Sequence, residues 1–80
     1  MTRLTVLYFA ALRDAAGLPS QEVQTPAATL QGLYEELQAQ HGFAFPVRQL
    51  RVAVDDVFAR WSDAPREGTE VAFIPPVSGG

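Results

Sequence analysis

The chain of 80 residues contains no cysteine and no lysine. Without cysteine, disulfide bonds, thiolate catalysis and cysteine-ligated zinc sites are excluded. All six basic residues are arginine, so the chain cannot be joined to another copy of itself through a lysine side chain. Compositional drift also produces a lysine-free chain and is the simpler explanation of that absence. Cysteine chemistry is therefore ruled out, whereas the lysine count alone carries no functional meaning.

Long apolar runs and an excess of positive charge are also missing. No apolar run approaches the roughly 18 residues of a membrane span, and the N-terminus has no signal-peptide pattern, so a cytoplasmic protein is the default expectation. The net charge of −3 argues against nucleic acid and favours partners with basic surfaces. The 48% of apolar residues is enough for one folded domain with a small core.

The spacing of apolar residues predicts several short strands around one main helix. Strands are expected at residues 4–9, 21–25, 50–54, 57–59 and 70–74. A helical turn is expected at residues 10–16, where Gly17 and Pro19 stop it. Strands grouped around one helix predict an α+β fold, with the helix packed on one face of a mixed sheet.

The main helix is predicted at residues 26–41. Thr29 is its candidate N-cap, and Gly42 stands where a glycine commonly ends a helix. Four large apolar residues recur at helical spacing: Leu30, Leu33, Tyr34 and Leu37. This apolar stripe is expected to pack on the sheet.

Alternation along the strands divides the side chains between two sheet faces. The face that covers the helix is predicted to carry Leu4, Val6, Tyr8, Val52, Val54, Val71 and Phe73. The opposite face is predicted to carry Thr5, Leu7, Phe9, Arg51, Ala53, Ala72 and Ile74, with Phe58 of the short strand beside them. Because Leu7, Phe9 and Ile74 are large and apolar, this face is predicted to bind another protein. The alternative is that a loop such as residues 43–45 covers it.

The polar residues do not form a recognisable catalytic or metal-binding group. Asp55 and Asp56 are adjacent, which suits a two-residue turn better than a catalytic pair of general acid and general base. Glu35 and Glu36 fit the solvated face of the helix. His41 is the only histidine and lies at a helix end, without a nucleophile motif or a second histidine. We therefore expect no metal site and no catalysis by the chain alone.

The last six residues carry the clearest functional signal: Pro75, Pro76, Val77, Ser78, Gly79 and Gly80. The two prolines favour extended backbone, so this tail is expected to project from a domain of residues 1–74. The glycines leave the terminal carboxylate open to attack from either side. A free carboxylate is ionised at neutral pH and is a poor electrophile, so another protein must activate it, for example as an acyl-adenylate. The alternative is a frayed end or a cloning remnant, although the glycines follow directly on a strand and a proline pair.

The sequence resembles the MoaD family, the small, sulfur-carrying subunits of molybdopterin synthase. The resemblance covers almost the whole chain and is strongest over residues 70–80, where a strand runs into Pro-Pro-Val-Ser-Gly-Gly. Further similarity lies in residues 6–13, in the helix start at Thr29 and Leu30 with Leu33 and Leu37, and in residues 52–54. Gly-Gly alone is a weak signal, because many ubiquitin-like proteins end with it.

The resemblance implies a ubiquitin-like β-grasp fold and a sulfur-carrier function. In this family an E1-like activating enzyme, MoeB, uses Mg-ATP to adenylate the terminal glycine, here Gly80, and a sulfurtransferase system converts it into a thiocarboxylate. The tail, with Gly79 for clearance, enters the active site of the large subunit, MoaE. There the sulfur passes to cyclic pyranopterin monophosphate, and two rounds form the dithiolene of molybdopterin. The implied assembly is a heterotetramer with the small subunits at its ends, and no cofactor is bound by the small subunit itself.

The resemblance also bears on the predicted interaction face. Phe9, Phe58 and Ile74 match family positions on an apolar docking surface, in agreement with the face derived from alternation. Asp55 stands where the family commonly has asparagine, and Arg60-Trp61 is unusual in its segment. Three other functions stay open: a thiamine-type sulfur carrier like ThiS, a ubiquitin-like modifier attached to lysines of other proteins, and a plain binding module.

Overall fold

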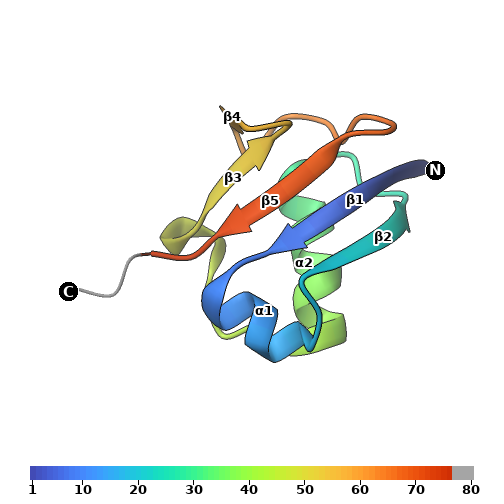
Figure 1. The fold of residues 1–80 in the computed structure, drawn as a ribbon. Helices are drawn as coiled ribbons and strands as arrows, with labels where there is room; N and C mark the ends of the chain where they lie inside the picture. The colour runs from blue at the N-terminus through green and yellow to red at the C-terminus, as the bar shows by residue number, and fades with distance from the viewer. Residues whose placement is uncertain (77–80) are drawn as a thin grey trace.

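The computed structural model describes residues 1–76, which form a five-stranded mixed sheet with one long helix across one face (Figure 1). The elements in chain order are β1 (Thr2–Tyr8), α1 (Ala10–Ala16), β2 (Ser20–Thr25), α2 (Leu30–His41), the 3-10 helix η1 (Val47–Gln49), β3 (Arg51–Val54), β4 (Val57–Ala59) and β5 (Glu70–Ile74). The predicted α+β class, with the helix on one face of a mixed sheet, is confirmed. The short helix η1 was not predicted.

The strand order places the last strand in the middle of the sheet. The order is β2-β1-β5-β3-β4, and among the strand pairs within residues 1–76 only β1 and β5 run parallel. Val6 pairs with Val71 and Tyr8 with Phe73, so the C-terminal ends of β1 and β5 lie side by side. The chain therefore leaves the sheet between the end of β1 and the start of β3, as Figure 1 shows.

Helix α2 begins and ends at capping residues. Thr29 has extended backbone, and its hydroxyl accepts a hydrogen bond of 3.0 Å from the Gly32 N–H, so the predicted N-cap is confirmed. The predicted start at residue 26 is wrong, because the cap residue places the first helical residue at Leu30. Gly42, with a φ of 75°, ends the helix as predicted. Within residues 1–76, no helix has the length and apolar character needed to cross a membrane.

The core lies between α2 and the sheet. The predicted helix stripe is fully buried, and so is every predicted sheet residue of that face except Val54, which is half-buried. The Tyr34 ring meets the Phe73 ring edge-on at 5.1 Å between centroids. The Tyr34 hydroxyl donates a hydrogen bond of 2.6 Å to the carbonyl oxygen of Phe45, so this buried polar group has a partner. The face assignment from alternation is therefore confirmed.

The turn between β3 and β4 shows what the adjacent aspartates do. Asp55 and Asp56 have positive φ angles of 49° and 69°, which suit a two-residue hairpin turn, as predicted. The Asp55 carboxylate accepts a hydrogen bond of 2.9 Å from the backbone N–H of Glu70. Asp55 therefore ties the β3–β4 hairpin to the start of β5, a contact that the sequence did not reveal.

Candidate functional site

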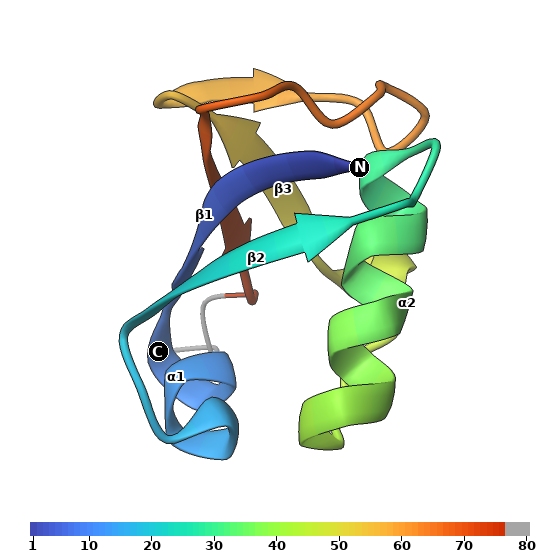
Figure 2. The same cartoon turned by 90° about the vertical axis from the view of Figure 1, so that its right-hand side faces the viewer.

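The predicted interaction residues lie on the sheet face that α2 does not cover. Figure 2 shows α2 on one side of the sheet, while α1 lies beyond one end of it. Strand register places four side chains of this face in one row across the sheet: Leu7, Ala72, Ala53 and Phe58. The next row towards the chain end pairs Ile74 with Arg51. We call Leu7, Phe9, Phe58 and Ile74, with the alanines between them, the outer apolar face.

Exposure differs across the outer apolar face. Phe58 is 63% exposed and Phe9 is 45% exposed, whereas Leu7 and Ile74 are half-buried. Two small residues, Ala72 and Ala53, separate Leu7 from Phe58 in the same row. The surface over Ala72 and Ala53 is therefore lower than the surface over Leu7 and Phe58 on either side of it. Such a depression suits a projecting apolar side chain of another protein.

The alternative that residues 43–45 cover this face is wrong. Phe43 is only 4% exposed and packs on the core side of the sheet. Its ring stacks on Tyr34, with 5.8 Å between centroids, and lies 5.6 Å from the ring of Tyr8. Because Tyr8 and Tyr34 belong to the core, this loop closes one end of the core and leaves the opposite face open.

The root of the tail borders an open groove of about 390 Å³. Its lining comes from η1, the start of β3 and the end of β5: Arg48, Gln49, Leu50, Arg51, Ile74, Pro75 and Pro76. Pro75 is half-buried and Pro76 is exposed. The other predicted tail residues, Val77, Ser78, Gly79 and Gly80, lie outside the described residues. The groove thus adjoins the outer apolar face through Ile74 and Arg51.

Arg51 makes a contact within this site that sequence reasoning missed. Its guanidinium carbon lies 4.9 Å from the centre of the Phe58 ring, a cation–π geometry. Ala53 pairs with Phe58 across the hairpin, so Arg51, two residues earlier on the same face, is a diagonal neighbour of that ring. A two-residue turn at 55–56 combined with strand alternation is the signal that could have revealed it.

The titratable groups of the described core have structural partners. Burial raises the pKa of Tyr8 to about 12, and burial also raises the pKa of Tyr34. The Tyr8 hydroxyl donates a hydrogen bond of 2.8 Å to Oε1 of Gln21, and His41 Nε2 lies 3.0 Å from the same oxygen. Among residues 1–76, no group of three or more His, Asp or Glu side chains could hold a metal ion. The described site thus offers apolar contacts and arginine side chains.

A helix on one face of a mixed sheet, with the last strand parallel to the first in its centre, is the ubiquitin-like β-grasp architecture. The solved structure of SAMP1 from Haloferax volcanii has this fold, with a TM-score of 0.80, 26% identity and coverage of 98% of this chain and 99% of its own. In a complex of subunits 1 and 2 of molybdopterin-converting factor from Helicobacter pylori, one chain shares the fold with a TM-score of 0.67 at 20% identity, over 99% of this chain and 100% of that one.

Comparison of amino-acid sequences identifies the family of the chain, which the shared fold alone does not. The model of the ThiS family matches residues 6–80. The molybdopterin synthase sulfur carrier subunit of Haemophilus influenzae is 35% identical, over 96% of this chain and 99% of that protein. The protein of the same name from Mycobacterium tuberculosis is 36% identical over the full length of both. The chain belongs to the ThiS family and, within it, to the molybdopterin synthase sulfur carrier subunits, so the resemblance seen in the sequence is confirmed.

Proposed function

We propose that Gly80 is the residue of this sulfur carrier that is activated and that carries the sulfur. Its carboxylate attacks ATP to form an acyl-adenylate with release of pyrophosphate, and a sulfur nucleophile then displaces AMP to leave a thiocarboxylate. That sulfur passes to cyclic pyranopterin monophosphate, and two such transfers build the dithiolene of molybdopterin. The observation that carries the proposal is identity of 32–36% with molybdopterin synthase sulfur carrier subunits over almost the whole chain, with Gly-Gly at its end.

The proposed partners supply the reactive groups. An E1-like activating enzyme, MoeB, would bring Mg-ATP, a sulfurtransferase would supply the sulfur, and the large subunit, MoaE, would hold the pterin substrate. All would work in the cytoplasm, and two small and two large subunits would form the heterotetramer. Six tail residues at about 3.3 Å each reach roughly 20 Å, which suits entry into a deep pocket while the outer apolar face docks outside.

Intact mass spectrometry tests the proposed chemistry directly. The chain is incubated with the activating enzyme, Mg-ATP and a sulfur source, and the product should contain one sulfur atom in place of one carboxylate oxygen. A chain without Gly80 serves as the negative control, and the homologous Escherichia coli carrier serves as the positive control. An unchanged mass for this chain, when the positive control is converted, would refute the proposal.

A ubiquitin-like modifier is the second candidate function. The supporting observation is the likeness to SAMP1, a small archaeal modifier protein, with a TM-score of 0.80 at 26% identity. A modifier would join Gly80 to lysine side chains of other proteins, and immunoblots would then show a ladder of larger species. A thiamine-type carrier would instead pass its sulfur to a thiazole precursor. The curated relatives favour the molybdopterin carrier over both.

Replacing Ile74 with arginine is expected to weaken binding to the large subunit about tenfold or more. The longer, charged side chain cannot fill the apolar contact that Ile74 makes, and its guanidinium loses water on docking; losses of this kind at an interface commonly amount to about 2 kcal/mol. Phe9→Ala should weaken binding in the same direction, which isothermal titration calorimetry would measure. Val57→Ala is the control, because Val57 is 69% exposed but alternates to the other face from Phe58. Unchanged affinity of the Ile74→Arg variant would show that the outer apolar face is not part of the interface with the large subunit.

A further inference from the structure

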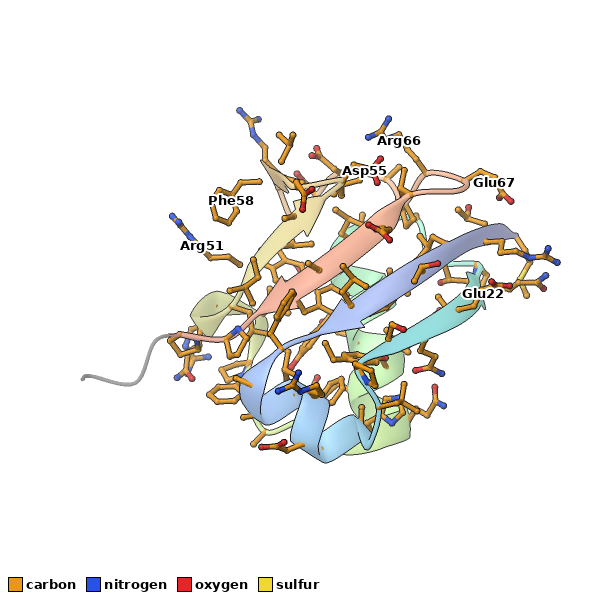
Figure 3. The ribbon with its side chains drawn as sticks, viewed as in Figure 1. Glu22, Arg51, Asp55, Phe58, Arg66 and Glu67 are labelled. Atoms are coloured by element: carbon orange, nitrogen blue, oxygen red, sulfur yellow. The ribbon has the colours of Figure 1, made fainter. Side chains whose placement is uncertain are left out.

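The charge of the outer sheet face differs between its two ends. The end away from the tail carries Glu22 and Glu70 together with Arg3, which alternates to the same face as Thr5, whereas the row nearest the chain end carries Arg51. At the end away from the tail, Thr5 pairs with both Glu22 and Glu70, so a row with two carboxylates crosses three strands there. The apolar row through Leu7 follows it, and the row with Arg51 lies nearest the chain end. Figure 3 shows Glu22 and Arg51 towards opposite ends of the sheet. A chain with a net charge of −3 thus has a basic end where its tail begins.

Two arginines make this basic end. Arg48 of η1 and Arg51 of β3 both line the groove that also contains Ile74, Pro75 and Pro76. Arg51 pairs with Ile74 across the strands, and its guanidinium lies over the Phe58 ring, 4.9 Å from the centroid. Contact with a ring limits the positions of a long side chain, so less conformational entropy is lost when it binds an anion.

We propose that Arg48 and Arg51 form a carboxylate-binding rim at the root of the tail. The protein that receives the tail would present acidic side chains at the mouth of its channel, beside an apolar side chain that fills the low middle of the outer apolar face. Basic side chains of the same partner would meet Glu22 and Glu70. This inference rests on the proposed function, since it assumes a partner that accepts Gly80.

Charge complementarity and continuity of the surface both support this partner. In the plane of the sheet, an apolar contact alone permits docking in either direction, whereas two arginines at one end and an excess of carboxylates over arginine at the other favour one direction. The favoured direction brings the partner's acidic mouth to the groove from which the chain continues towards Gly80. The rim therefore orients the partner, and the apolar face holds it.

Neutralising the rim tests this partner chemistry. Affinity for the large subunit is measured by calorimetry at about 50 mM and about 500 mM NaCl for wild type and the double variant Arg48→Gln/Arg51→Gln. The double variant should bind about tenfold more weakly at low salt, with most of that difference lost at high salt, because exposed ion pairs are screened. Glu22→Gln/Glu70→Gln should also weaken binding.

The matched control is Arg3→Gln/Arg66→Gln, which removes the same two positive charges at the end away from the tail. Attraction of the acidic chain to a basic partner through net charge alone would make both arginine double variants bind more tightly. Tighter binding by both double variants, or equal weakening of binding by both, would overturn the proposal that Arg48 and Arg51 bind acidic side chains of the partner. A second titration uses ATP in place of the large subunit. Chemical-shift changes at Arg48 and Arg51 would then show that these arginines bind a nucleotide, and would overturn the proposal that they bind carboxylates of the partner.

The test separates this inference from the proposed function. A wild-type chain that fails to bind the large subunit overturns both. A wild-type chain that binds and carries sulfur, with a salt dependence that the rim variants leave unchanged, overturns the rim alone. Thermal unfolding at the same midpoint for all variants would show that differences in affinity come from the surface.

Discussion

Deletion of Gly80 is expected to abolish sulfur transfer while the affinity for the large subunit stays within about twofold of wild type. Only the terminal carboxylate can be adenylated, and a chain that ends at Gly79 presents its carboxylate about 3.3 Å short of the position that the partner's groups address. A misplacement of this size commonly costs a factor of about 100 or more in rate. Docking should survive, because the outer apolar face lies in residues that the deletion leaves unchanged.

Molybdopterin formation in a reconstituted assay would measure the first part, and calorimetry the second. Ser78→Ala is a suitable control, since it alters the tail without changing its length or its terminal carboxylate. Full activity of the Gly80 deletion would contradict the proposed mechanism. Loss of binding together with activity would mean that the tail, more than the sheet face, holds the complex together.

Phe73→Ala is expected to destabilise the fold by about 3–5 kcal/mol, the usual cost of removing a buried phenylalanine. Phe73 is completely buried in the central strand β5, stacks on Trp61 with 5.8 Å between centroids, and meets Tyr34 edge-on. A domain of this length has about 4–12 kcal/mol of total stability, so a large share would be lost. Urea denaturation followed by circular dichroism would measure the change.

Phe58→Ala is the matched control for this substitution. The residue type is the same, but Phe58 is 63% exposed on the edge strand β4, so its removal should cost less than about 1 kcal/mol. It should weaken docking instead, because Phe58 belongs to the outer apolar face. Equal losses of stability for the two variants would contradict the assignment of Phe73 to the core and Phe58 to the surface.

Local pattern was sufficient to predict most of the elements and the two sheet faces. Alternation with a period of two assigned Val6 and Val71 to the core and Leu7 and Ile74 to the other face, as the structure confirms. The start of α2 was misplaced by the apolar and proline content of residues 26–28, although the capping threonine was identified. Helix η1 was missed because three residues are too few to show a periodic signal.

The sequence by itself determined which chemistry is absent and which residues carry the proposed reactive group. The lack of cysteine and the Gly-Gly ending are covalent facts that folding cannot alter. Period and capping likewise act over a few residues, so they can be recognised along the chain.

Only the tertiary structure decided which distant residues share a site. Insertion of β5 between β1 and β3 brings Ile74 beside Arg51 and places the root of the tail against η1. The same arrangement joins the Asp55 carboxylate to the backbone of Glu70, while the β3–β4 hairpin sets the Arg51 guanidinium over Phe58. Strand order and register depend on pairing between segments up to about 65 residues apart, and this pairing buries one face of the strands against α2. No local pattern contains that information, because the free energy of such pairing belongs to the folded sheet as a whole.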